Sequence, residues 1–290
     1  MTPAEERLTR DQQREAARAK ARELREQQKK SDKRKRLAIQ LGVVFGVLLV
    51  IGGVVATIML GAQRAANTGL EPKNLSFDGG LKMGVQQELF TADSTPTISP
   101  TAGAAAPINI QMYIDYQCPI CQAFEIPNET QLKSWMDTGV ATLELHPISF
   151  LDGRGSPNEY SSRAANAAIC VAEYSPKNFW FFHTSLMKNQ PQELTPGPSN
   201  QELFDVAKST GITNADKIES CIKDKSFGAW IKNTTDKVLS PEYTVKGSNI
   251  PVEGTPTIVV NGQKYEWTTG EELVNPARFA QWVQQAAAQK

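Results

Sequence analysis

The chain has 290 residues with 31 basic and 31 acidic side chains, so its formal net charge is zero. That balance hides two unlike parts: residues 1–36 hold 13 basic and 7 acidic residues, and the remainder holds 18 and 24. Acidic residues are interleaved with the basic ones in this leader, which argues against a nucleic-acid-binding segment. Its Ala, Glu, Gln, Arg and Lys residues are good helix formers, and we expect a solvated helix or a disordered tail; contact with phospholipids or with a cytosolic partner is the alternative.

An apolar stretch follows from Leu37 to Ala62, in which Gln40 is the one strongly polar side chain. A helix needs about 20 such residues to cross the hydrocarbon core of a membrane. A cleaved signal peptide would have a shorter apolar core and a small-residue cleavage site, which we do not find. The sequence therefore predicts an uncleaved anchor, and the basic residues before it keep the N-terminus cytoplasmic. Residues 63–290 are then expected outside the cytoplasm.

Residues 63–106 are predicted to be an extracytoplasmic linker. Ser94 to Ala106 is rich in Thr, Pro, Ser and Ala, and it lacks the apolar side chains of a core. Asp78-Gly79-Gly80 predicts a turn. A short strand around Leu81–Met83 is expected to join the edge of the domain that follows.

The domain at 107–290 alternates strand and helix patterns. In chain order we first expect a buried strand at Ile108–Ile114, a helix at 119–138 that is interrupted or kinked at Pro127, and a strand at Ala141–Ile148. A helical region follows at about 157–240. We then expect a hairpin of Thr257–Val260 and Lys264–Trp267 around Asn261-Gly262, and a closing helix at Asn275–Ala288. This order predicts an α/β domain of the α+β type, with a helical domain inserted between its two halves.

Cys118-Pro119-Ile120-Cys121 lies just after the first strand, where the first helix begins. The attacking species in thiol chemistry is the thiolate, and the free N–H groups at a helix N-terminus favour a negative charge. We therefore expect the pKa of Cys118 to be lowered. Cys121, one turn into the helix, is suited to resolving a mixed disulfide.

Two other interpretations of these cysteines remain. Zinc would need a second closely spaced ligand pair, but Cys170 and Cys221 each stand alone in helical segments. His146 and His183 also lack metal-ligand spacing, so we expect hydrogen-bonded structural histidines and no metal. The other alternative is a purely structural disulfide within the Cys-x-x-Cys pair.

The segment Asp115–Phe124, which reads DYQCPICQAF, resembles the active-site segment of the DsbA family of the thioredoxin-like fold. Val252–Thr257, followed by Val260-Asn261-Gly262, resembles that family's cis-proline loop and hairpin. His146-Pro147 and Phe179–His183 also resemble it. The match covers roughly residues 107–290. With the anchor and the second cysteine pair, the chain is similar to the membrane-anchored DsbA-like proteins of actinobacteria.

The resemblance implies a cis Thr255–Pro256 bond whose backbone faces the cysteine sulfurs and pairs with an extended substrate segment. The alternative is an ordinary turn proline. Asp115 is expected either to cap the helix or to accept a proton near Cys121, and Tyr116 and Gln117 to line the rim of the site.

The family's strongly oxidising members have a histidine between the two cysteines, where this chain has Pro119-Ile120. Neither residue offers a side-chain charge. We expect a potential below the roughly −120 mV extreme and above the roughly −270 mV of thioredoxin.

Cys170 and Cys221 are expected to form a structural disulfide across about 50 residues, because exported proteins retain disulfides. Two buried free thiols are the alternative.

The predicted function is that of a membrane-anchored thiol:disulfide oxidoreductase that introduces disulfides into exported cysteine-containing proteins. We expect a monomer without a cofactor. The resemblance implies an integral-membrane reoxidising partner of the DsbB or vitamin K epoxide reductase type. The alternatives are a disulfide reductase or isomerase with the same site, and a non-catalytic thioredoxin-like surface binding module.

Overall fold

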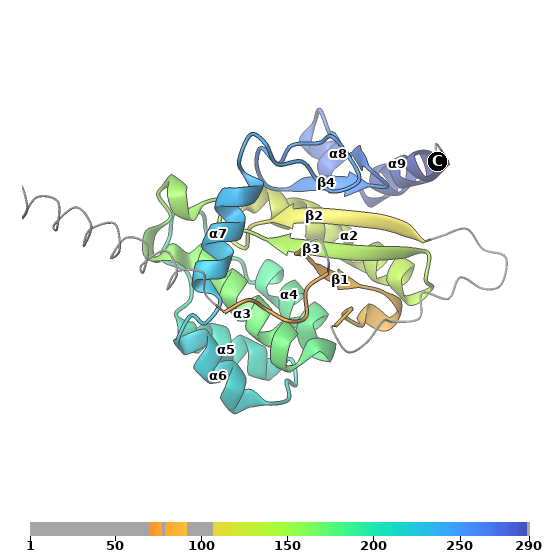
Figure 1. The fold of residues 1–290 in the computed structure, drawn as a ribbon. Helices are drawn as coiled ribbons and strands as arrows, with labels where there is room; N and C mark the ends of the chain where they lie inside the picture. The colour runs from red at the N-terminus through yellow and green to blue at the C-terminus, as the bar shows by residue number, and fades with distance from the viewer. Residues whose placement is uncertain (1–69, 77–78, 92–106, 289–290) are drawn as a thin grey trace, which may run out of the picture. The chain divides into compact units, whose positions relative to one another are not determined.

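The computed structural model describes residues 70–76, 79–91 and 107–288 (Figure 1). The predicted leader, the predicted membrane anchor and most of the predicted linker lie outside these residues. Among the helices within the described ranges, none is both long and apolar enough to cross a membrane.

The strands of the described residues form one mixed sheet in the order β1-β3-β2-β4-β5 (Figure 1). Their bounds are Leu81–Met83 (β1), Ile108–Ile114 (β2), Ala141–Pro147 (β3), Thr257–Val260 (β4) and Gln263–Lys264 (β5). β2 and β3 are parallel, and the other neighbouring pairs are antiparallel. The edge strand predicted around Leu81–Met83 is present and pairs with β3.

β2 is the central strand, and Ile110 to Ile114 are all buried. A strand that is covered on both faces needs a nearly continuous apolar run, which is what this segment provides. The register places Ile114 beside Pro147 of β3 and Tyr113 beside Thr257 of β4. The end of β2, from which the active-site turn starts, therefore lies beside the start of β4.

The helices divide into two groups. Those of the strand-bearing part are α2 (Pro119–Asp137), α8 (Gly270–Val274) and α9 (Pro276–Ala288). Those inserted between β3 and β4 are α3 (Tyr160–Tyr174), α4 (Phe179–Lys188), α5 (Asn200–Ser209), α6 (Ala215–Lys223) and α7 (Gly228–Val238). Short 3₁₀ turns lie at Val85–Gln87, Asp152–Arg154, Pro157–Glu159 and Pro176–Asn178. The region predicted as helical at about 157–240 is thus a bundle of separate helices, and α3 to α6 gather on one side of the sheet (Figure 1).

Helix α2 runs through Pro127 without the predicted interruption. A proline inside a helix removes one backbone hydrogen bond. The buried side chain of the next residue, Asn128, donates a hydrogen bond of 2.7 Å to the carbonyl oxygen of Phe124. This contact supplies a polar partner within the turn that contains the proline.

The second strand of the C-terminal hairpin is shorter than the predicted Lys264–Trp267. β5 ends at Lys264, and the side chain of the next residue, Tyr265, packs against α9. Its ring centroid lies 5.0 Å from that of Phe279 and 5.1 Å from that of Trp282. The backbone N–H of Tyr265 still donates a hydrogen bond of 2.9 Å to the Ile258 carbonyl oxygen of β4, while its ring packs on α9.

A disulfide joins Cys170 of α3 to Cys221 of α6, with a Cα–Cα distance of 5.9 Å. Both residues are buried, so the bridge links two helices inside the insert. The alternative of two free thiols at these positions is not what the structure contains.

Candidate active site

Cys118 occupies the N-cap position of α2, with Pro119 as the first helical residue. Proline suits that position because its missing N–H would have no partner there and its φ matches the helix. Cys118 has extended backbone angles, φ −79° and ψ 114°, and its residue surface is 6% exposed. Cys118 thus lies beside the first turn of the helix and is buried.

The two thiols of the active-site pair differ in acidity. The pKa of Cys118 is lowered to about 6, first by a hydrogen bond from the Cys121 thiol and then by Thr255 and the N–H groups of Cys121 and Ile120, while burial opposes the shift. Cys121 is fully buried, and burial raises its pKa well above the usual range. At neutral pH the outer sulfur is therefore mostly a thiolate and the inner one a thiol.

The Thr255–Pro256 peptide bond is cis. The Cys118 sulfur lies 3.3 Å from the carbonyl oxygen of Thr255, to which the thiol form donates a hydrogen bond. The buried Thr255 hydroxyl has no hydrogen-bond partner within the described residues, and the Thr255 side chain helps to lower the pKa of Cys118. The structure therefore brings Cys118, Cys121 and the 255–256 loop together, as the sequence predicts.

Asp115 does not cap α2, because Cys118 holds the N-cap position. Its buried carboxylate instead accepts hydrogen bonds from the backbone N–H groups of Gln117 and Leu151 and from the Ser161 hydroxyl. Burial raises its pKa to about 7. The capping alternative is therefore wrong, and these hydrogen bonds connect Asp115 to the helical insert.

The prediction that Tyr116 and Gln117 line the rim of the site is also wrong, since both are fully buried. Gln117 donates from its side-chain amide to the carbonyl oxygens of Gln192 and Thr195, and its amide oxygen accepts from the Ser156 hydroxyl. The Tyr116 hydroxyl likewise contacts His183 of α4, so both side chains face the helical insert. The large apolar side chain that is exposed beside the cysteines is Ile120, at 44%.

Both histidines are buried. His183 Nε2 lies 2.6 Å from a carboxylate oxygen of Glu125, and its Nδ1 lies 3.1 Å from the Tyr116 hydroxyl. His146 stacks on Tyr113 with ring centroids 4.3 Å apart. The prediction of a hydrogen-bonded histidine is confirmed for His183, and the contact described for His146 is a ring stack.

Sequence reasoning missed two residues near the cysteines. Glu125 lies four residues after Cys121, on the same face of α2, and helical periodicity was the available indication. Gln190 donates a hydrogen bond of 3.0 Å to the carbonyl oxygen of Cys118. It belongs to the segment between α4 and α5, and no local pattern relates it to Cys118.

An acidic cysteine at a helix N-terminus, a buried second thiol and a cis-proline loop on a mixed sheet together define a thioredoxin-fold dithiol site. The thioredoxin family model matches residues 99–284, and the chain belongs to this family. The structure is similar to the reduced form of the disulfide bond oxidoreductase DsbG from Mycobacterium tuberculosis. That match has a TM-score of 0.55 and 26% identity, and it covers 72% of this chain and 87% of that one.

Two curated relatives share part of the sequence. Disulfide bond formation protein D from Bacillus subtilis is 29% identical over 161 residues, which is 54% of this chain and 64% of that protein. The serine/threonine-protein kinase PknE from Mycobacterium tuberculosis is 31% identical over 177 residues, which is 57% of this chain and 29% of the kinase. The matches thus span less than two thirds of either relative's length.

Proposed function

We propose that this protein is a membrane-anchored, extracytoplasmic thiol:disulfide oxidoreductase that introduces disulfides into exported proteins. The observation that carries the proposal is the Cys118 sulfur, with a pKa of about 6, placed 3.3 Å from the Thr255 carbonyl oxygen. A reactive sulfur and an extended backbone edge are thereby available to the same substrate segment.

The reaction starts from the oxidised Cys118–Cys121 pair. A substrate thiolate attacks the Cys118 sulfur, the Cys118–Cys121 bond breaks, and Cys121 leaves and takes up a proton. A second substrate thiolate then attacks the substrate sulfur of the mixed disulfide and releases Cys118 as a thiolate. The substrate loses two electrons and gains one disulfide, and the enzyme is left reduced. The low pKa of Cys118 makes it a good leaving group in the second step.

The acidity of Cys118 supports the proposed direction of electron flow. At pH 7 a Cys118 thiol with a pKa of about 6 is about tenfold more ionised than protonated. This ionisation stabilises the reduced folded protein by about 1.4 kcal/mol relative to a protein whose thiol has an ordinary pKa. For a two-electron couple this corresponds to about 30 mV towards a more oxidising potential. This stabilisation favours an oxidase over a reductase.

The residue roles are part of the proposal. Cys118 exchanges with the substrate, Cys121 resolves or re-forms the bond, and Thr255 with Pro256 presents the backbone to which substrate binds. The Cys170–Cys221 bridge stabilises the insert. A disulfide between helices of the insert also supports an oxidising compartment.

The anchor, the location and the partners rest on the sequence and on resemblance. The apolar segment 37–62 would hold the protein in the membrane in which a reoxidising protein of the DsbB or vitamin K epoxide reductase type resides. Cysteine-containing exported proteins would be the substrates, in keeping with a relative described as a disulfide bond formation protein. Retention of the chain in the membrane pellet after alkaline carbonate extraction tests the anchor, and release into the supernatant contradicts it.

The oxidised full-length protein in detergent is mixed with a reduced protein that has several cysteines. We expect disulfides to appear in the substrate, with one enzyme molecule reduced for each disulfide formed. Cys118→Ala should abolish this reaction. Reduction of a disulfide-bonded substrate without oxidation of a reduced one would indicate a reductase. No redox reaction with either substrate, together with substrate binding that Cys118→Ala leaves unchanged, would indicate a non-catalytic binding module.

A further inference from the structure

We propose that Asp115 is a positioning residue for Cys118: its buried carboxylate fastens the active-site turn to the helical insert and so controls how readily the Cys118 sulfur reacts. The inference rests on the proposed thiol chemistry of Cys118. It assigns to this carboxylate a task other than capping α2.

The geometry joins three separate segments at one side chain. The Asp115 carboxylate accepts from Gln117 N at 2.8 Å, Leu151 N at 2.9 Å and the Ser161 hydroxyl at 2.7 Å. These donors belong to the active-site turn, to the segment after β3 and to the first turn of α3. The Asp115 main-chain oxygen also accepts from Cys118 N at 3.0 Å. One residue therefore closes the turn that presents the nucleophile and fixes that turn to the insert.

A carboxylate with no exposed surface requires such donors. Burial raises the pKa of Asp115 to about 7, its three hydrogen bonds act in the opposite direction, and the Cys118 charge adds a smaller rise. Tyr160 of α3 also interacts with Asp115, and burial raises the pKa of its phenol so that it stays neutral. Removing the carboxylate would leave the Leu151 and Gln117 N–H groups without their acceptor, and the turn would lose its anchor on the insert.

Three roles for Asp115 predict different changes in the acidity of Cys118. If Asp115 positions the turn, its loss moves the Cys118 sulfur away from the donors that stabilise the thiolate, and the pKa of Cys118 rises. If Asp115 acts only through its charge, the pKa of Cys118 falls on its loss, and only slightly, because a carboxyl with a pKa of about 7 is mostly neutral where Cys118 ionises. If Asp115 only stabilises the fold, the pKa stays unchanged.

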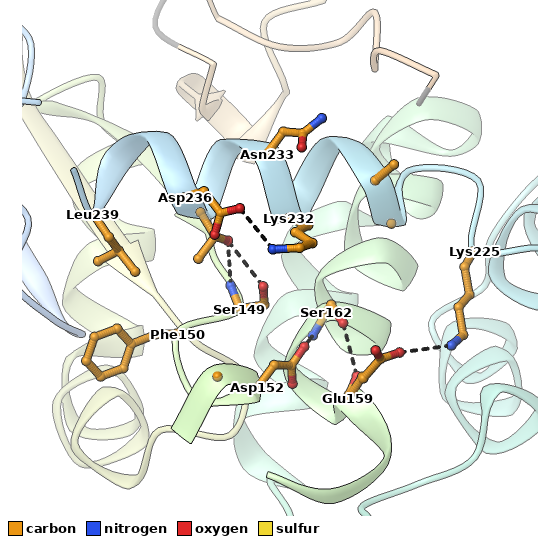
Figure 2. Close-up of a pocket in the computed structure, with 14 residues that line it drawn as sticks. Ser149, Phe150, Asp152, Glu159, Ser162, Lys225, Lys232, Asn233, Asp236 and Leu239 are labelled. Carbon is orange, nitrogen blue, oxygen red and sulfur yellow. Dashed lines mark hydrogen bonds and ion pairs between the residues drawn. The ribbon is translucent and has the colours of Figure 1, made fainter. Parts of the chain in front are cut away.

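Asp152 offers a matched control in the same segment. Its carboxylate accepts from the backbone N–H groups of Ser161 and Ser162 at 3.1 and 3.0 Å. Asp152 lines a cavity of about 600 Å³. Figure 2 shows its side chain there, together with the Lys225–Glu159 and Lys232–Asp236 ion pairs. Asp152 therefore holds the first turn of α3 as Asp115 does, without a hydrogen bond to the active-site turn.

The experiment titrates the Cys118 thiolate by its absorbance at 240 nm in the reduced full-length protein in detergent, between pH 4 and pH 9. Cys121 stays protonated in this range. We expect Asp115→Ala to raise the midpoint by about one pH unit, which lowers the rate of iodoacetamide alkylation at pH 5 about tenfold. Asp115→Asn keeps one acceptor oxygen, so its midpoint should rise less than that of Asp115→Ala. Asp152→Ala should leave the midpoint unchanged.

Ser161→Ala removes a single donor and should give a smaller upward shift, so the test stands even if Asp115→Ala does not fold. An unchanged or lowered midpoint in the Asp115 and Ser161 variants would overturn the proposal, as would an equal rise in Asp152→Ala. The readout needs no protein substrate. A protein that fails to oxidise substrates but shows these shifts would refute the proposed function and leave this inference in place.

Discussion

The pH dependence of the redox potential follows directly from the unequal acidity of the two thiols. Below pH 6 both sulfurs of the reduced form carry protons, so reduction takes up two electrons and two protons. Above pH 6 Cys118 is a thiolate and Cys121 remains a thiol, so reduction takes up two electrons and one proton. Each proton contributes about 30 mV per pH unit to a two-electron couple. The potential should fall by about 59 mV per pH unit below pH 6 and by about 30 mV per unit from there to pH 8.

The assay equilibrates the full-length protein with mixtures of reduced and oxidised dithiothreitol at a series of pH values. The reduced fraction is trapped with acid, alkylated and counted by mass spectrometry of the peptide that contains Cys118 and Cys121. Dithiothreitol serves as the internal reference because its thiols remain protonated over this range. A single slope of about 59 mV per unit through pH 8 would refute the reasoning, because Cys118 would then be protonated at neutral pH.

Three further predictions concern stability. Between pH 5 and pH 8 the free energy of unfolding of the reduced form should rise by about 2–3 kcal/mol relative to that of the oxidised form. A thiol whose pKa is lowered by folding stabilises the fold at high pH, and this stabilisation is lost as pH falls through about 6. Urea unfolding of both forms measures the difference. Replacing Cys170 and Cys221 by alanine should cost about 4 kcal/mol in the free energy of unfolding, because the bridge closes a loop of 51 residues; a loss below 1 kcal/mol would contradict this. Gly197→Ala should lower the free energy of unfolding by about 2 kcal/mol or more, because φ is +61° at this position and a Cβ would lie 2.4 Å from the Tyr160 ring. Thermal unfolding measures the loss, and an unchanged melting temperature would argue against the described packing.

The sequence predicts much of the fold because its patterns are local. The apolar run at Ile108–Ile114 matches β2, and the Asn261-Gly262 turn lies between β4 and β5. The N-terminus of α2 at Pro119 follows from the strand, the cysteine pair and the proline. Each of these elements is encoded by a few consecutive residues.

The contacts behind the active site could not be predicted, because they join residues far apart in the chain. Asp115 bonds to Leu151 and Ser161, which are 36 and 46 residues further on, and Gln117 bonds to Thr195, which is 78 residues further on. Polar side chains beside a cysteine pair suggested an exposed rim, whereas the insert covers them. Their burial depends on how the insert packs on the sheet, which no single segment encodes.

The most direct test of the account is to identify the cysteine that captures a substrate. Cys121→Ala removes the resolving thiol, so the variant should accumulate a mixed disulfide between Cys118 and an oxidised protein substrate, which peptide mapping locates. Cys118→Ala should yield no such adduct. An adduct of equal yield in Cys118→Ala, or none at Cys118 in Cys121→Ala, would contradict the claim that the sulfur beside the cis-proline loop carries out the exchange.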